Sequence, residues 1–170
     1  MTPEQIITEA LDNYESLLIS YAREITGELE SAKDAVQETF LRLSSQNLNV
    51  LQPRLRPWLF VVCRNCALDH VRKIVKFSAD PVEDHERASD DPAPDERAIA
   101  SEEGKRIWDL VAGLPLQQRE IVKLKFEAGL SYKEIAEALK TSVSTVGVQL
   151  HDAMQTLRNQ WGYETSEGAV

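Results

Sequence analysis

The sequence predicts an all-α protein: two small helical domains joined by an acidic linker, the C-terminal one containing a helix-turn-helix. Three observations support this fold class. Apolar residues recur at spacings of three and four along most of the chain. Residues 131–157 fit two short helices joined by a tight turn, and residues 78–103 hold ten acidic against two basic side chains. We expect a helical domain at 1–77, a flexible linker at 78–101, a second helical domain at 102–162 and a frayed tail at 163–170.

Composition and charge set limits on the function. No apolar run in the chain approaches the about 20 residues that span a bilayer, and the N-terminal sequence MTPEQIITEAL lacks the features of a secretory signal. We therefore expect no membrane insertion, a cytoplasmic location and no disulfide framework. The net charge of −9 lies almost entirely in residues 78–103, which carry −8, so both domains are close to neutral.

The first domain is expected to begin with two amphipathic helices. Thr2, Pro3 and Gln5 form a good helix start, and apolar residues then recur until Gly27 ends the run. A second helix is expected to begin with Ser31 as its cap. Its apolar face is expected to leave four polar residues outside: Asp34, Gln37, Glu38 and Arg42.

A third helix combines apolar and basic halves. Residues 44–56 break the helical period, so we expect an irregular loop before a helix that Pro57 opens. Residues 54–76 hold six basic side chains against one acidic one, a local charge of +5. Such a stripe is suited to following phosphates. A solvated helix face is the alternative interpretation.

The second domain is expected to contain a helix up to Leu114, a helix from Pro115, and then the helix-turn-helix. Ser131 and Glu134 form a capping box, and Ser142 can cap the second helix of the motif. The residues expected on its buried face are Val143, Val146, Leu150, Ala153, Met154 and Leu157, and those expected outside are Ser144, Thr145, Val148, Gln149 and Asp152. Ser, Thr and Gln can bond base edges in a major groove. Two helices of a simple bundle are the alternative.

Signatures of catalysis and metal binding are missing or weak. The sequence contains no P-loop, G-x-G-x-x-G, H-E-x-x-H or G-x-S-x-G motif, so we expect neither an enzyme nor a cofactor. Cys63, Cys66 and His70 suggest a metal, but a closed zinc site needs four ligands and the other nearby candidate is His85. We interpret the cysteines as small buried side chains.

Two stretches of the chain agree with one protein family. The first is DAVQETFLRL at 34–43 with RPWLFVVCRNCALDHVRK at 56–73, and the second is LPLQQREIVKLKFEAGLSYKEIAEALKTSVSTV at 114–146. Together they resemble a bacterial RNA polymerase sigma factor of the extracytoplasmic-function (ECF) type, which has only the second and fourth conserved sigma regions. The resemblance implies core RNA polymerase and promoter DNA as partners, an anti-sigma factor as the regulator, and a nucleic-acid-like acidic connector.

The resemblance also implies roles for single residues. Core polymerase would dock on Asp34, Gln37, Glu38 and Arg42. The melted minus-ten element would be held by Asn47 and Asn49 of the loop and by Asn65, Asp69, Arg72, Lys73 and Lys76 of the third helix. The minus-thirty-five duplex would be read by Lys133, Ser142, Ser144, Thr145 and Gln149.

The recognition helix departs from the family pattern, which usually places cations after Val146. Here Gly147, Val148, Gln149 and Asp152 stand instead, so phosphate contacts are lost, and Gly147 costs about 1 kcal/mol relative to Ala. We expect weak duplex binding. Besides an initiation factor, the alternatives are a sigma-like adaptor or decoy that reads little DNA, and a helix-turn-helix regulator that dimerises on operator DNA.

Overall fold

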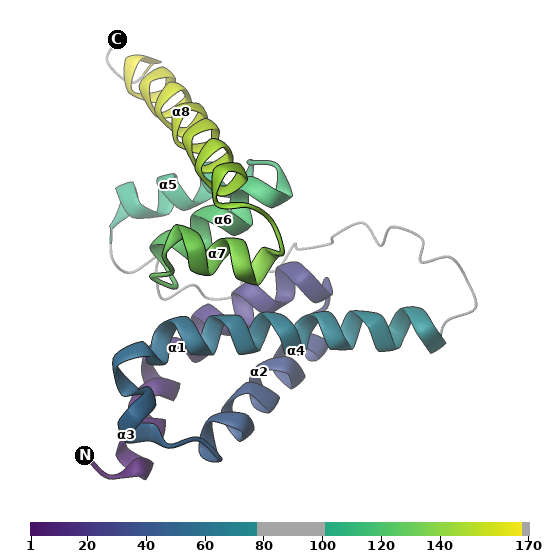
Figure 1. The fold of residues 1–170 in the computed structure, drawn as a ribbon. Coiled ribbons are helices and arrows are strands. Elements are labelled where there is room, and N and C mark those ends of the chain that lie inside the picture. Colours follow the sequence, from purple (N-terminus) through teal and green to yellow (C-terminus); the bar gives the residue numbers. More distant parts are fainter. Residues whose placement is uncertain (78–100, 168–170) are drawn as a thin grey trace. The chain divides into compact units, whose positions relative to one another are not determined.

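The computed structural model describes residues 1–77 and 101–167, and every regular element within these ranges is a helix, as the sequence predicts (Figure 1). The chain divides into two compact units, Met1–Pro94 and Asp95–Val170. The linker expected at 78–101 lies outside the described residues except for Ser101. The Ser101 hydroxyl accepts a hydrogen bond from the Gly104 N–H at 2.9 Å and caps the first helix of the second unit.

Helix α1 (Pro3–Thr26) begins and ends where the sequence predicts. The Gln5 N–H donates to the Thr2 hydroxyl at 3.2 Å, and the Thr2 N–H donates to the Gln5 side chain at 2.9 Å, which completes a capping box. Gly27 ends the helix in the left-handed conformation at φ 76°. A residue without a Cβ adopts this conformation at little cost.

Helix α2 (Leu29–Ser44) starts before the predicted cap at Ser31. Glu28 occupies the N-cap position but its side chain caps no backbone N–H, and the Thr26 hydroxyl donates to the Glu28 carbonyl at 3.0 Å. The earlier start gives the N–H of the buried Ala32 a partner, the Glu28 carbonyl at 3.1 Å. Tertiary packing therefore overrides the local capping signal.

The segment before α4 is more regular than predicted. It contains a short helix, α3 (Leu48–Leu51), and a 3-10 turn, η1 (Gln52–Arg54), and the buried side chain of Leu48 anchors it. Helix α4 (Leu55–Phe77) then follows, so Pro57 lies within its first turn rather than opening it. Proline is tolerated there because first-turn N–H groups have no partner within the helix.

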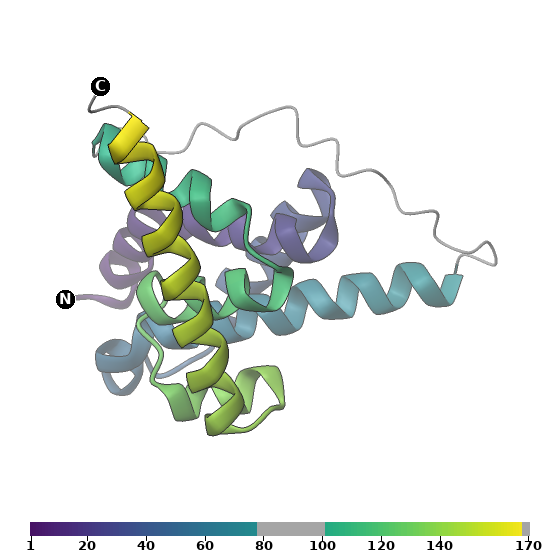
Figure 2. The same cartoon turned by 90° about the horizontal axis from the view of Figure 1, so that it is seen from above.

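Helices α1, α2 and α4 pack on one another and form the core of the first unit. The rings of Tyr21 and Phe60 lie 5.6 Å apart between centroids, and the Cys63 thiol donates to the Leu18 carbonyl at 3.7 Å. The C-terminal end of α4 continues beyond the other helices of its unit (Figures 1 and 2), and residues 72–76 are exposed. One end of α4 is thus buried and the other is in contact with solvent.

The second unit contains α5 (Glu102–Ala112), α6 (Leu116–Phe126), α7 (Tyr132–Leu139) and α8 (Val143–Glu167). Helix α8 contacts the other three, and its buried side consists of Val146, Leu150, Ala153 and Leu157. The Arg106 guanidinium of α5 lies 4.8 Å from the ring centre of Trp161. The tail expected to be frayed from residue 163 is helical up to Glu167, and residues 168–170 lie outside the described part.

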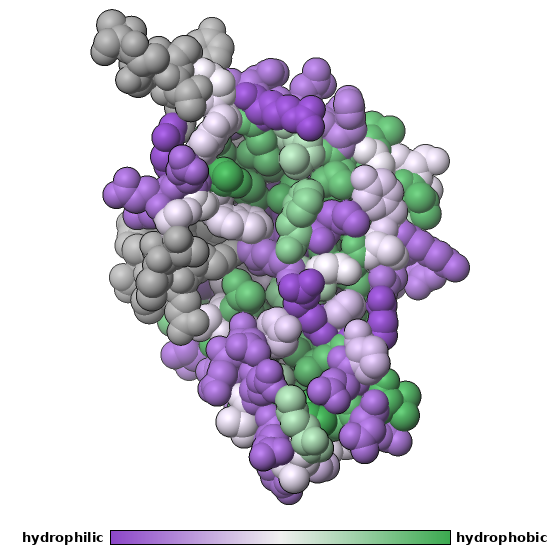
Figure 3. Space-filling model, turned by 90° about the vertical axis from the view of Figure 1, so that its left-hand side faces the viewer, coloured by the Kyte–Doolittle hydropathy of each residue, from purple (hydrophilic) through white to green (hydrophobic). Residues whose placement is uncertain are grey.

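The surface combines polar and hydrophobic side chains. Across residues 1–77 and 101–167, no helix is both long enough and apolar enough to cross a membrane. Leu41 is nevertheless 60% exposed and Val148 is 59% exposed. On the face in Figure 3, hydrophobic surface occurs in patches between hydrophilic side chains. Leu41 is next to Arg42 in the sequence and Val148 is next to Gln149, so each lies beside a polar residue predicted to bind a partner.

Candidate nucleic-acid interface

Five polar residues form a stripe along one side of α4, here called the α4 stripe: Asn65, Asp69, Arg72, Lys73 and Lys76. They fall within about 100° of one another around the helix axis and extend about 17 Å along it. Asp69 is half-buried and the other four are exposed. The Arg72 guanidinium lies 3.5 Å from the Asp69 carboxylate. The stripe therefore combines cations that can bind phosphates with an amide and a carboxylate that can read base edges.

The predicted loop asparagines lie at the other end of α4. Asn47 occupies the N-cap position of α3, but its side chain does not cap the helix. Asn47 and Asn49 are both exposed and flank the buried Leu48. Helix α3 lies near the N-terminal end of α4 (Figure 1), and about 27 Å of helix separates Leu55 from Lys73. The structure does not gather the asparagines and the cations into one pocket, so a ligand that contacts both must be extended.

The predicted docking residues of α2 are accessible: Asp34, Gln37 and Arg42 are exposed and Glu38 is half-buried. The Arg42 Nε donates to the Glu38 carboxylate at 3.2 Å. The Cys66 sulfur, this hydrogen bond and, more weakly, the Asp69 carboxylate raise the pKa of Arg42. Arg42 therefore lies where α2 meets the α4 stripe, and the docking face borders the stripe.

The sequence analysis missed an apolar groove beside these docking residues. The groove, of about 560 Å³, lies between α1 and α2 and includes Gln37, Phe40 and Leu41 in its lining. The remaining lining residues are Leu11, Glu15, Ile19, Lys33, Val36 and Ser44. The available signal was Leu41, which interrupts the polar outer side of α2 and is 60% exposed.

The two cysteines of α4 lie beneath this surface. Burial raises the pKa of Cys63 to about 12 and also raises the pKa of Cys66, so both thiols are protonated at neutral pH. Metals bind the thiolate form. In the parts of the chain that the structure describes, no group of three or more His, Cys, Asp or Glu side chains could hold a metal ion. His85, the fourth ligand considered from the sequence, lies outside those parts.

Helices α7 and α8 form the predicted helix-turn-helix. Ser131 and Glu134 make the predicted capping box, with hydrogen bonds of 3.0 and 3.1 Å. Lys140 ends α7 in the left-handed conformation at φ 55°. Ser142 then caps α8 by accepting a hydrogen bond from the Thr145 N–H at 3.0 Å, and the hydroxyls of Ser142 and Thr145 are 2.8 Å apart. Two side chains predicted to bind DNA thus hold the turn.

The side chains of α8 that are accessible to a ligand differ from those predicted from the sequence. Gln149 is half-buried, and its side-chain oxygen accepts a hydrogen bond from Gln118 of α6 at 3.2 Å. Val143, predicted to be buried, is 48% exposed because it is the first residue of the helix. His151 was not predicted to lie on the outer side of α8, although its spacing of three from Val148 was the available signal. After Val143, the exposed residues up to Asp152 of α8 are Ser144, Val148, His151 and Asp152, and Lys133 is exposed on α7.

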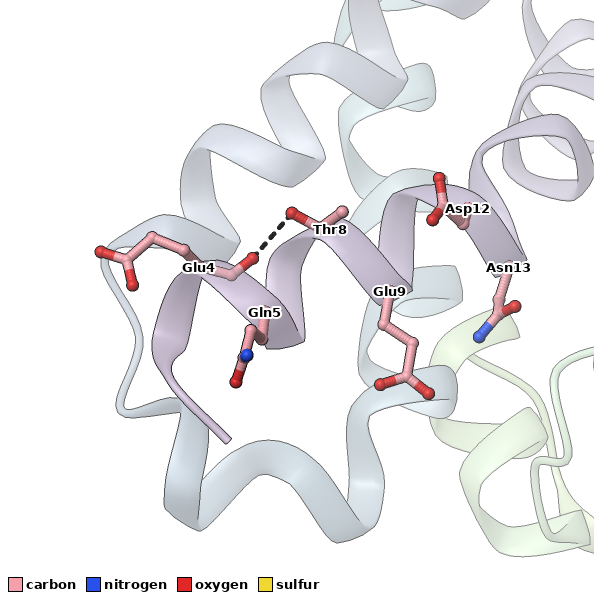
Figure 4. Close-up of a pocket in the computed structure, with 6 residues that line it drawn as sticks. All are labelled: Glu4, Gln5, Thr8, Glu9, Asp12 and Asn13. Carbon is pink, nitrogen blue, oxygen red and sulfur yellow. Dashed lines mark hydrogen bonds between the residues drawn. The ribbon is translucent and has the colours of Figure 1, made fainter.

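A hollow along α1 is lined by acidic side chains and is therefore unsuited to nucleic acid (Figure 4). Its lining residues are Glu4, Gln5, Thr8, Glu9, Asp12 and Asn13. The Thr8 hydroxyl donates to the Glu4 carbonyl at 2.8 Å and is satisfied within its own helix. Three carboxylates and no cation in the lining would repel phosphates, so this hollow is not part of the candidate interface.

Known families match the same two units. The Sigma-70 region 2 family model matches residues 11–76, and the Sigma-70, region 4 family model matches residues 104–157. The ECF RNA polymerase sigma factor SigL of Mycobacterium tuberculosis is 32% identical over 150 residues, which cover 86% of this chain and 84% of SigL. The ECF RNA polymerase sigma factor SigD of Mycobacterium bovis is 31% identical over 162 residues, which cover 91% of this chain and 76% of SigD.

A solved structure shares the fold. The sigma factor RpoE of Bartonella quintana, in a co-crystal with the anti-sigma factor NepR, matches with a TM-score of 0.54 at 21% identity, over 92% of this chain and 96% of that chain. The region 2 match contains the α4 stripe, and the region 4 match contains the helix-turn-helix. The chain therefore belongs to the ECF RNA polymerase sigma factors, which are transcription initiation factors that bind core RNA polymerase.

Proposed function

We propose that this sigma factor holds the melted minus-ten element on the α4 stripe. The observation that carries the proposal is the one-sided arrangement of Asn65, Arg72 and Lys73, all exposed on the same side of α4. Cations hold the backbone of a single strand, and an amide can pair with the freed edge of an unstacked base. Asn47 and Asn49 would contact the same strand several nucleotides away from the cations.

Core polymerase would dock on α2 through both polar and apolar contacts. Asp34, Gln37, Glu38 and Arg42 supply polar groups, and the groove at Leu41 supplies hydrophobic area. This combination is typical of protein interfaces, in which polar groups surround an apolar centre. Because Arg42 borders the α4 stripe, docking would place polymerase beside the melted strand.

Each of the two units would bind its own element of the promoter. Residues 1–77 would bind polymerase and the minus-ten element, residues 102–162 would contact the minus-thirty-five duplex, and residues 78–101 would connect the two. Lys133 would contact a phosphate, while Ser142 and Thr145 would position α8. An anti-sigma factor would cover the exposed apolar side chains when polymerase is absent, and the protein would act in the cytoplasm without catalysis or a cofactor.

An adaptor or decoy role is the second candidate function. The start of α8, residues 143–152, contains no Lys or Arg, so this helix gains little from phosphate contacts. A protein that binds polymerase or an anti-sigma factor but reads little DNA would have such a helix. Promoter-dependent transcription distinguishes the two functions.

Run-off transcription with core polymerase from the source organism and a promoter library tests the proposal. With this protein as the only initiation factor, we expect transcripts from promoters that share an upstream and a downstream motif. Replacing Arg72 and Lys73 together by Ala is expected to abolish them. The matched control replaces Lys105 and Arg158, two exposed cations outside the stripe, and should retain most transcription. Core binding without transcripts would favour the adaptor, and no core binding would contradict both functions.

A further inference from the structure

One side of α8 faces away from the core of its unit. Ser144, Val148, His151 and Gln155 are spaced by three or four residues and lie within about 60° of one another around the helix axis. All four are exposed. Val148 is the large hydrophobic side chain among them, and it is 59% exposed. The buried side of the same helix determines this orientation, because Val146 and Ala153 are completely buried.

Two polar groups expected to read DNA are already engaged within the unit. The Thr145 hydroxyl lies 2.8 Å from the Ser142 hydroxyl, and Gln149 accepts its hydrogen bond from Gln118. Both side chains are half-buried. A groove that receives α8 by its outward side therefore meets Val148 before it meets Thr145 or Gln149.

We propose that Val148 determines promoter specificity by packing against the 5-methyl group of a thymine in the upstream duplex element. The inference rests on the proposed function, in which residues 102–162 contact the minus-thirty-five duplex, and it requires that α8 enter the major groove of that duplex. Valine makes no hydrogen bonds, so it would leave the polar edge of another base without water or a partner. The thymine methyl is the apolar group that the major groove presents, and apolar side chains contact it.

The residue next to Val148 supports a close approach. A Cβ added at Gly147 would meet nothing within 4 Å, so the glycine leaves open space beside the valine. The lack of cations at the start of α8 also makes a base contact by Val148 more important. With no Lys or Arg at residues 143–152, phosphate contacts by this helix are few, and each base contact accounts for a larger share of its binding.

Replacing thymine by uracil tests the contact directly, because uracil lacks the methyl group and keeps every hydrogen-bonding atom. Promoters selected from the library by the holoenzyme would be rebuilt with one deoxyuridine at a time in the upstream element, and open-complex formation would be measured. We expect at least one position at which the substitution weakens the wild-type holoenzyme about fourfold, the factor for one buried methyl group. Val148→Ser should lose this preference and should still bind core polymerase, since the side chain is mostly exposed.

Val143→Ser is the matched control, because Val143 is also about half exposed but lies outside the outward side of α8. This variant should keep the preference for thymine over uracil. The proposal is overturned if no position distinguishes the two bases, if Val148→Ser still distinguishes them, or if Val143→Ser also loses the preference. If the holoenzyme transcribes none of the thymine-containing library, the proposed function itself is contradicted. In the other outcomes the thymine-containing promoters are transcribed, so the two failures can be told apart.

Discussion

At the scale of single residues, Cys63 shows how packing fixes the chemical state of a side chain. Its thiol is buried between α1, α2 and α4 and lies 3.7 Å from the Leu18 carbonyl. Burial raises its pKa from 9.0 to about 12. The thiol therefore acts as a small apolar group in the core, and the C-x-x-C spacing reflects helix packing rather than chemistry.

This pKa predicts a loss of stability at alkaline pH. Above about pH 9 the unfolded chain releases the Cys63 proton while the folded chain keeps it, so rising pH favours the unfolded state. Relative to Cys63→Ala, the wild type is expected to lose about 1.4 kcal/mol of unfolding free energy per pH unit between pH 9 and 11. Urea denaturation followed by Trp58 fluorescence, with Trp108 and Trp161 replaced by Phe in both proteins, measures the difference. Parallel pH profiles would contradict the assignment.

Gln149 shows which residue-scale features could not be predicted from the sequence. Its hydrogen-bond partner, Gln118, is 31 positions away on another helix, and no local pattern indicates that the two side chains meet. The capping box of Ser131 and Glu134 was predictable because both residues lie within one helical turn. Local hydrogen bonds can be read from spacing, whereas contacts between helices depend on the packed unit.

At the scale of elements, α8 contains a glycine, Gly147, at a position where its own unit has room for a side chain. Replacing Gly147 by Ala places the new Cβ in open space and is expected to stabilise the helix by about 1 kcal/mol. Hydrogen exchange of the α8 amides should then slow about fivefold. Gly162→Ala, whose added Cβ would also meet nothing within 4 Å, is the matched control and should slow exchange less because it lies nearer the helix end. Unchanged exchange in Gly147→Ala would contradict the prediction.

The elements of the first unit show the limits of periodicity. The sequence predicts the α4 stripe because its five residues share one helix, and helical spacing alone aligns them. The start of α2 was predicted wrongly at Ser31. The helix starts at Leu29, and the N–H of the buried Ala32 is thereby paired with the Glu28 carbonyl. Helix α3 was predicted as an irregular loop, because its single buried anchor, Leu48, gives no repeating pattern.

At the scale of the whole molecule, each unit has its own core and its own candidate interface. The first unit presents the predicted docking residues of α2 next to the α4 stripe, and the second presents α8 of the helix-turn-helix. The net charge of −9 hides this division, because the acidic excess lies in residues 78–103, where the sequence passes from one unit to the next. We propose that the α4 stripe, rather than α8, accounts for promoter opening.

Permanganate oxidation of unpaired thymines separates the role of the α4 stripe from that of α8, on one selected promoter with holoenzymes of equal core affinity. The wild type is expected to make thymines of the minus-ten element reactive. A variant with Arg72 and Lys73 replaced by Ala should leave them protected while still binding core polymerase, and Val148→Ser should lower the number of complexes without protecting the thymines within them. Reactive thymines with the Arg72 and Lys73 variant, at the wild-type level, would contradict the account.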